Sequence, residues 1–189
     1  GSVFKLKTNS EPCDSSLVRI KNGGSFIIGD ESNGILNKGE VYFRNNSVLE
    51  ILGNGSLIIK DSSRLIIEEG ATLIIHPGAY ISLEGHNSVL ELKGKVITKD
   101  YASFETHGNG FIRFAAEMDA NNINDYWQIG NNSSLILSNA NSTQLKKAEI
   151  VKNTFFPDSL NIFCSNVSVE LDSMVTMNIF GSIQAQNSV

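Results

Sequence analysis

The sequence predicts an all-β fold, a parallel β-helix (solenoid) in which the chain winds through short strands and corners. Three observations predict it. Pairs of apolar residues at positions i and i+2 recur every eight or nine residues between residues 49 and 92. Turn-forming residues, mostly Gly, Asn, Asp, Ser and Pro, separate these pairs. No window carries the i, i+3, i+4, i+7 apolar stripe of an amphipathic helix.

The repeat is clearest in residues 55–85, which read GSLIIKDSSRLIIEEGATLIIHPGAYISLEG. Alternation at i and i+2 is the periodicity of a strand, because successive side chains of a strand point to opposite faces. An antiparallel sandwich would use hairpins and less uniform strands. A regular short period instead favours stacked coils, in which each coil covers the inward side chains of its neighbour. Three octads then form a three-sided coil of about 23–25 residues.

A three-sided coil predicts which apolar residues lie above one another. We expect one side to carry Val18, Val41, Leu65 and Leu90, a second to carry Phe26, Leu49, Leu73 and Ile97, and the third to carry Leu57 and Ile81. The same register aligns outward-facing charges, namely Arg44, Glu68 and Lys93 on the first side and Lys60 with Glu84 on the third. Opposite charges at the strand spacing of about 4.8 Å support the register, although exposed pairs contribute only about 0–1 kcal/mol each.

The domain organisation follows from where the octads hold. We expect a single β-helix over residues 17–189, with regular coils over 17–100 and irregular coils with longer loops over 101–189. A separate C-terminal domain is the alternative, although no Pro-rich or Ser-rich linker marks a boundary. Residues 1–16 form either an N-terminal cap or a remnant of cloning, since Gly1-Ser2 resembles a cloning scar. We therefore expect the chain to be a piece of a larger protein with flanking domains.

The composition argues against several classes of partner. The net charge of −5 and the scattered basic residues, whose longest run is Lys146-Lys147, argue against nucleic-acid binding. No stretch approaches the roughly 20 apolar residues of a membrane span. Cys13 and Cys164 are separated by six or so coils, or about 30 Å, so we expect them to be unpaired. Cys164 alternates with Ile162, which predicts a buried thiol.

The run NGSLIIKDSSRLIIEEGATLIIHPGAYISLEG, followed by YWQIGNNSSLILSNA and KKAEIVKN, resembles the right-handed β-helix repeats of secreted bacterial surface proteins. It is most similar to large Bacteroidetes proteins exported by the type IX system, in which G-A-T-L-x-I repeats precede a W-Q-x-I segment and looser coils. The resemblance covers residues 16–185. It implies a right-handed coil and a secreted or cell-surface location. It implies no activity, because this fold hosts adhesins, spacers, polysaccharide lyases and hydrolases.

Catalytic and metal-binding residues are not evident in the regular coils. Inverting glycosidases need two carboxyl groups about 6.5–9.5 Å apart, but the outward positions mix isoleucines with isolated charges, and Glu68-Glu69 is a corner pair. The histidines His76, His86 and His107 lack the spacing of a metal site, so we expect them to face solvent at corners. We therefore expect no enzymatic activity and no cofactor. The alternative is a polysaccharide-acting enzyme, a lyase or glycoside hydrolase, or its carbohydrate-binding domain.

The loop EMDANNINDYW is the one segment that suggests a metal. Asp119, Asn121 and Asp125 fall at alternating positions and offer oxygen ligands of the kind that Ca²⁺ prefers. Ile123 occupies a position where a calcium loop carries Asp or Asn, and the usual turn glycine is missing. An Asx-rich surface turn is therefore favoured over a calcium site.

The next residues suggest a ligand site. Alternation in YWQIG pairs Trp127 with Ile129 toward the core, which leaves Tyr126 and Gln128 outward. If the chain binds a glycan, we expect the site in residues 115–132, with Asp125 taking part beside those two outward residues.

Two short motifs suggest modification. The segments DSL at 158–160 and DSM at 172–174 resemble the Asp-Ser/Thr-apolar site that Bacteroidetes glycosylate on the hydroxyl, which nominates Ser159 and Ser173.

Together these observations predict a non-catalytic structural or adhesive module of a secreted or cell-surface bacterial protein. Its work would be that of a rigid spacer, or of a surface that binds an extracellular glycan or a surface protein.

Overall fold

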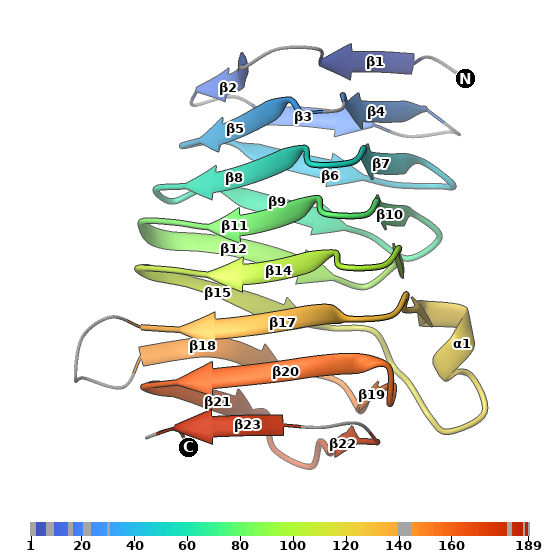
Figure 1. Cartoon of the computed structure of the whole chain (residues 1–189), viewed down its shortest axis with the longest axis vertical. Helices are drawn as coiled ribbons and strands as arrows, with labels where there is room; N and C mark the ends of the chain where they lie inside the picture. The colour runs from blue at the N-terminus through green and yellow to red at the C-terminus, as the bar shows by residue number, and fades with distance from the viewer. Residues whose placement is uncertain are drawn as a thin grey trace.

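The computed structural model describes residues 3–6, 10–14, 17–20, 24–29, 31–139, 145–180, 183–186 and 188. The chain is an all-β parallel solenoid of about seven turns in which 57% of residues lie in strands. It descends from the N-terminal to the C-terminal end, with the strands in front and those behind running in opposite directions (Figure 1). The chain therefore winds as a right-handed coil (Figure 1). The predicted fold class is confirmed.

Three parallel sheets form the sides of the coil, and successive strands visit them in turn. Sheet A contains β1 (Val3–Leu6), β4 (Ser25–Ile28), β7 (Val48–Ile51), β10 (Thr72–Ile75), β13 (Lys95–Thr98) and β16 (Trp127–Gln128). Sheet B contains β2 (Ser10–Asp14), β5 (Asn33–Asn37), β8 (Ser56–Lys60), β11 (Tyr80–Leu83), β14 (Ser103–Thr106), β17 (Ser133–Ser138), β20 (Leu160–Ser165) and β23 (Ile183–Gln186). Sheet C contains β3 (Leu17–Ile20), β6 (Glu40–Phe43), β9 (Arg64–Ile67), β12 (His86–Leu92), β15 (Asn109–Phe114), β18 (Leu145–Ile150) and β21 (Val167–Leu171). A short fourth sheet pairs β19 (Thr154–Phe156) with β22 (Met177–Ile179), and the helix α1 spans Ile123–Tyr126.

The predicted register is confirmed on two sides of the coil and over most of the third. Sheet C stacks Val18, Val41, Leu65 and Leu90, sheet B stacks Leu57 on Ile81, and sheet A stacks Phe26, Leu49 and Leu73. Paired residues from Val3 to Phe111 lie 22 to 25 positions apart along the chain, close to the predicted coil length.

The prediction for the next residue of sheet A is wrong by one position. Leu73 pairs with Val96, which is buried, whereas Ile97 pairs with Ile74 on the outer face. Both residues of the Val-Ile pair are apolar, so alternation alone does not decide which faces inward. The pairing of β13 with β10 decides it, because Lys95 lies beside Thr72 and Val96 beside the inward Leu73.

The sheets extend beyond the regular octads in both directions. β1 and β2 lie within residues 1–16 and pair in parallel with β4 and β5. β17, β20 and β23 continue sheet B through the irregular half. There the coils lengthen, with 31 positions between Val96 and Trp127 and 36 between Ile112 and Ala148. The extra residues leave the coil at corners, so sheets B and C continue past them, whereas sheet A ends at β16 and the separate pair of β19 and β22 follows.

The corners explain why the period is eight. Left-handed backbone, with φ between 51° and 79°, recurs at every eighth position, namely Lys38, Asn46, Asn54, Ser62, Gly70 and Gly78. Corners also hydrogen-bond to one another, as when the Asn46 N–H donates to the Gly70 carbonyl oxygen at 2.9 Å. The residue that follows the left-handed position is small, and Ser47, Ser63, Ala71 and Ala79 are buried. Each octad therefore encodes one strand and one tight corner.

The core changes character along the axis. Stacked aliphatic residues fill the regular coils, whereas the irregular coils contain an aromatic cluster of Phe114, Trp127 and Phe156, with ring centroids 5.0–6.3 Å apart. The inward position predicted for Trp127 is confirmed, since it is only 4% exposed. Among the described residues no helix is long and apolar enough to cross a membrane.

The predicted burial of Cys164 is confirmed as well. Its thiol is unpaired, and burial raises its pKa. The side chain of Cys13 lies outside the described residues. Its strand β2 is six strands away from β20 within sheet B, which corresponds to about 29 Å at the strand spacing.

Candidate functional site

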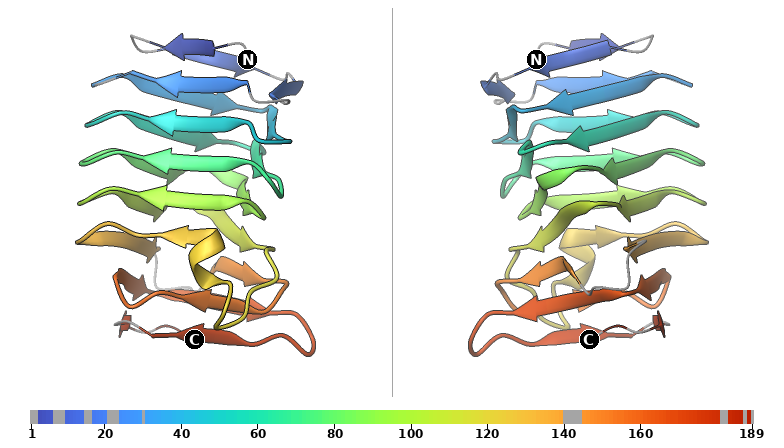
Figure 2. Two further views of the ribbon diagram at one scale, coloured as in Figure 1. Left: turned by 90° about the vertical axis from the view of Figure 1, so that its right-hand side faces the viewer. Right: turned by 90° about the vertical axis from the view of Figure 1, so that its left-hand side faces the viewer.

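The loop proposed for glycan binding leaves sheet C after β15 and returns through α1 to β16 of sheet A (Figure 2). Asp125 and Gln128 are exposed, whereas Tyr126 is half-buried and packs against the core. The pKa of Tyr126 is raised by burial and then by the nearby charges of Glu69, Asp125 and Glu117.

Asp125 and Tyr126 line a hollow of about 290 Å³. Its other walls come from the corner and strand positions Gly70, Ala71, Thr72, Lys93, Gly94 and Lys95. Gln128 is not among the lining residues. The structure therefore brings only two of the three predicted glycan-binding residues to one hollow, and the aromatic one is turned partly toward the core.

The residues proposed for calcium form a turn. The Asp119 carboxylate accepts hydrogen bonds from the backbone N–H groups of Asn121 (2.7 Å) and Asn122 (3.0 Å). The Asn122 side-chain oxygen accepts one from the Asp119 N–H at 2.7 Å. These bonds form an Asx turn, as the favoured interpretation expects. Within the described ranges, no three His, Cys, Asp or Glu side chains are grouped to hold a metal ion. Calcium binding by Asp119, Asn121 and Asp125 stays a prediction.

The two proposed modification sites both lie in turns. Ser159 is half-buried immediately before β20, and Ser173 is exposed after β21. Glycosylation of either hydroxyl stays a prediction.

The outer face of sheet C carries a continuous network, which we call the ion-pair ladder: Glu40, Arg44, Arg64, Glu68, Glu91 and Lys93. Arg64 bridges Glu40 and Glu91 at 3.3 Å each. Lys93 bridges Glu91 at 3.0 Å and Glu68 at 3.3 Å, and Arg44 contacts Glu68 at 3.5 Å. The predicted alignment of Arg44, Glu68 and Lys93 is confirmed.

The ladder neutralises itself. The Glu91 side chain is only 8% exposed and has a cation at each carboxylate oxygen. Burial alone would lower the pKa of Lys93, but the acidic groups of Glu91 and Glu68 raise it above its ordinary value. Lower on the same face, Glu149 lies 3.2 Å from Arg113 and 3.8 Å from Lys146. Three acids and three bases in the ladder therefore leave no excess charge to bind an ionic ligand.

One lysine behaves differently from its neighbour. Lys146 faces outward, but Lys147 is fully buried at the register shift of β18. Its Nζ donates to the carbonyl oxygens of Gly108 and, at 3.4 Å, Gly110. Burial lowers the pKa of Lys147 to about 8. The sequence shows only a basic pair at this point, and a bulge in the strand decides which member turns inward.

Two of the histidines contact carboxylates. His76 Nε2 lies 2.7 Å from Glu50, and His107 Nε2 lies 3.3 Å from Glu105. The other nitrogen of His107 is 3.5 Å from Ser138 Oγ, so a hydroxyl, an imidazole and a carboxylate meet on the outer face of sheet B. The sequence does not reveal this set, because Ser138 lies 31 positions beyond His107 and joins it only through stacking.

In this structure the Ser138 hydroxyl does not donate its proton to His107. It donates its proton to the Thr106 carbonyl oxygen at 3.1 Å. Its 3.5 Å distance to His107 exceeds the roughly 2.6–3.2 Å of a working nucleophile–base pair. The His107 side chain is also 48% exposed, so water competes for its nitrogens.

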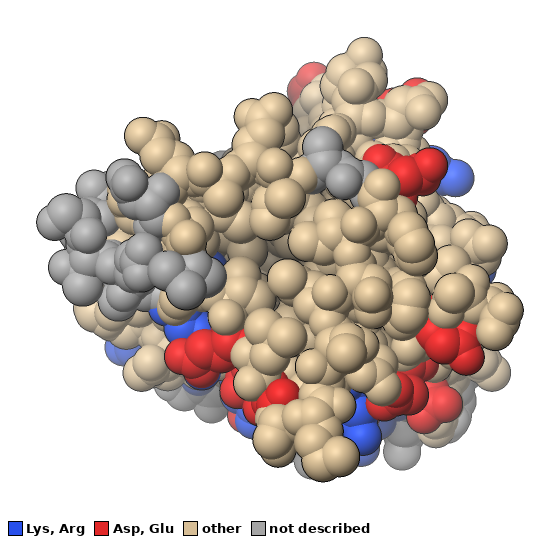
Figure 3. Space-filling model, turned by 90° about the horizontal axis from the view of Figure 1, so that it is seen from below, with Lys and Arg blue, Asp and Glu red and all other residues tan. Residues whose placement is uncertain are grey.

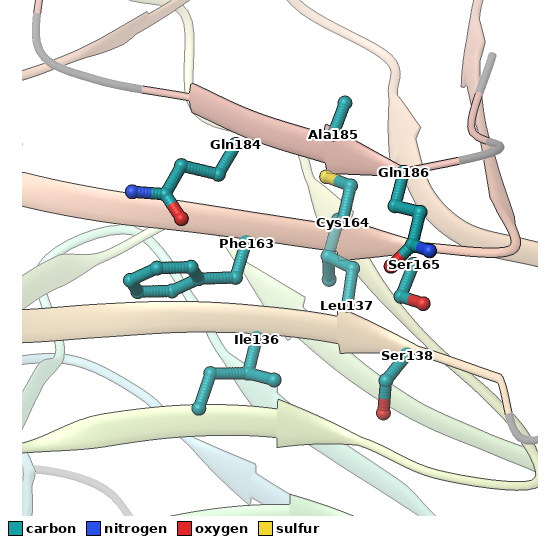
Figure 4. Close-up of a pocket in the computed structure, with 9 residues that line it drawn as sticks. All are labelled: Ile136, Leu137, Ser138, Phe163, Cys164, Ser165, Gln184, Ala185 and Gln186. Carbon is teal, nitrogen blue, oxygen red and sulfur yellow. The ribbon is translucent and has the colours of Figure 1, made fainter.

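A groove lies beside Ser138 on the same face, with a volume of about 370 Å³. Two columns of outward side chains form its walls: Ile136, Phe163 and Gln184 on one side, and Ser138, Ser165 and Gln186 on the other (Figure 4). Leu137, Cys164 and Ala185 lie between the columns. We call these nine residues the sheet B groove. None of them is charged.

Exposed apolar side chains concentrate toward the same end of the solenoid. Within the part of the chain that the structure describes, the exposed large hydrophobic residues other than Tyr101 are Phe163, Leu171, Met174, Phe180 and Ile183. Seen from the C-terminal end, uncharged residues cover most of the surface and the charged ones lie toward its rim (Figure 3). The surface at this end is therefore largely uncharged.

Comparison of the chain with protein-family models, with curated proteins and with solved structures finds no match.

Proposed function

We propose that the chain is a non-catalytic structural or adhesive module of a secreted or cell-surface bacterial protein, acting as a rigid spacer or as a surface for a glycan or a protein. One observation carries the proposal. The coils stack in parallel sheets, of which sheet B continues through eight strands, while the outward charges of sheet C neutralise one another in the ion-pair ladder. The location rests on the resemblance of the octads to secreted β-helix repeats.

The stack supports a role as a stiff rod. The coils from β1 to β18 are joined through all three sheets, and sheets B and C continue the joining below them. About seven turns at about 4.8 Å each span about 34 Å along the axis. Stretching the rod would break backbone hydrogen bonds in every sheet that joins two coils, and bending it would break those on its outer side. Exposed ion pairs add little energy individually, but the ladder holds its long side chains in one arrangement.

The test of the non-catalytic part is direct. The purified chain is incubated with a panel of neutral and acidic polysaccharides, and reducing ends and unsaturated sugar ends are measured over time. We expect no product above that of heat-denatured protein. Product that increases with the concentration of folded protein would refute the proposal.

A polysaccharide-acting enzyme is the second candidate, and the meeting of Ser138, His107 and Glu105 is the observation in its favour. If product were formed, His107→Ala and Glu105→Gln would locate its source. Loss of product in both variants would support a catalytic role of this set. Unchanged product would place the activity elsewhere on the chain.

A further inference from the structure

We propose that the sheet B groove binds an uncharged polysaccharide chain that lies along the solenoid axis and packs against the ring of Phe163. This inference rests on the adhesive form of the proposed function and names its ligand class and its site.

The groove has the shape for an extended ligand. Its walls come from three stacked strands, β17, β20 and β23, so side chains of similar position repeat along the axis at about 4.8 Å. A ligand chain between the two columns therefore runs across the strands (Figure 4). A peptide that binds by strand addition would need the edge of a sheet and not its face.

The groove also has the chemistry for a sugar. Phe163 is 37% exposed on the outer face, and Ile136 lies next to it in the same column. These two offer an apolar surface to the C–H face of a sugar ring. Gln184, Gln186 and Ser165 supply amide and hydroxyl groups that can both donate to and accept from sugar hydroxyls. A few placed polar groups on an apolar surface are typical of small-ligand sites.

The charge pattern selects a neutral ligand. The nine groove residues are uncharged. His107 lies beside the groove, 3.5 Å from Ser138, but the Glu105 carboxylate 3.3 Å from its other nitrogen offsets a positive charge there. Ser103 also donates to Glu105 at 2.9 Å. An anionic polysaccharide would lose hydration in the groove without gaining a cation partner.

The groove fits better than the loop predicted from sequence. Tyr126 of that loop is half-buried and packs against the core, whereas Phe163 is 37% exposed. The hollow beside Tyr126 also contains Lys93, Lys95 and Asp125, which makes it charged.

The experiment measures binding of the whole chain to soluble polysaccharides by affinity electrophoresis and titration calorimetry. The panel contains neutral chains (a β-glucan, a mannan, a galactomannan) and anionic ones (polygalacturonate, alginate). We expect at least one neutral chain to bind and the anionic chains not to bind. Phe163→Ala should weaken binding about tenfold, the equivalent of about 1.4 kcal/mol, whereas Phe163→Tyr should retain it.

Matched variants keep the test falsifiable. Tyr101→Asn removes an exposed aromatic at a distant corner and keeps a residue that tolerates left-handed backbone, so it should bind normally. Ser165→Arg places a long charged side chain in the groove and should abolish binding, even if Phe163→Ala proved unstable in thermal unfolding. Binding that is unchanged in Phe163→Ala and Ser165→Arg would overturn the groove and leave the adhesive function standing. Absence of binding to every polysaccharide would overturn the groove together with the glycan-adhesive function, and a preference for the anionic chains would overturn the choice of ligand.

Discussion

The two adjacent residues Val96 and Ile97 of β13 provide a sharp test of the fold, because they face opposite ways. Val96 is 1% exposed and lies between Leu73 and Trp127 in sheet A. Ile97 is half-buried on the outer face, where it pairs with Ile74. Replacing each with alanine therefore compares an inward with an outward side chain of the same strand.

We expect the smaller side chain, Val96, to contribute more to the free energy of unfolding than the larger one, Ile97. Val96→Ala removes two methyl groups from the core, and at about 0.8 kcal/mol each plus a cavity term it should lower the free energy of unfolding by about 2–3 kcal/mol. Ile97→Ala removes more carbon, but from a partly hydrated surface, so it should cost about 1 kcal/mol or less. Transfer energy alone, without the inward or outward position, would give the opposite order.

Urea unfolding followed by far-ultraviolet circular dichroism measures both variants. Because arrays of repeats do not always unfold in one step, the comparison uses midpoints at an unchanged m-value. If Ile97→Ala proves more costly than Val96→Ala, then Ile97 faces the interior and the pairing of β13 with β10 is shifted by one residue.

Three further predictions use the same unfolding assay. Gly94→Ala should cost about 2 kcal/mol or more, because its Cβ would lie 2.4 Å from the carbonyl oxygen of Ala71 and 2.5 Å from that of Glu68. A smaller loss would mean that the corner is loosely packed. Glu91→Gln should lower the free energy of unfolding by about 1–3 kcal/mol, since it leaves two cations around an uncharged, largely buried group. Glu40→Gln, at the exposed end of the ladder, should lower it by only about 0–1 kcal/mol. Equal effects of the two substitutions would contradict the burial of Glu91. Burial lowers the pKa of Lys147 to about 8 from the 10.5 of an ordinary lysine, so between these pH values the unfolded chain binds more protons than the folded one. The free energy of unfolding should therefore rise from pH 8 to 10.5 by up to about 3 kcal/mol. If the same rise persisted in Lys147→Met, it would arise from other groups and the prediction would be wrong.

Much of the site could not be found from sequence for a physical reason. Arg44, Glu68 and Lys93 were aligned correctly because they sit one regular coil apart, and their ion pairs follow from that spacing. The groove joins residues from β17, β20 and β23, where coil lengths vary between 27 and 21 positions. Without a fixed period, the sequence does not predict which residues of neighbouring coils lie beside Phe163.

The sequence by itself determined the coil, because the information needed is local to each octad. A left-handed position, a small buried residue and an inward apolar pair recur at positions such as Gly70, Ala71 and Leu73, and they specify strand and corner without distant contacts. Only the tertiary structure decided which of two adjacent apolar or basic residues turns inward, as at Val96 and Lys147. Those choices depend on the room in the core and on the hydrogen-bond acceptors that neighbouring coils supply. The sequence of a single strand does not contain this information.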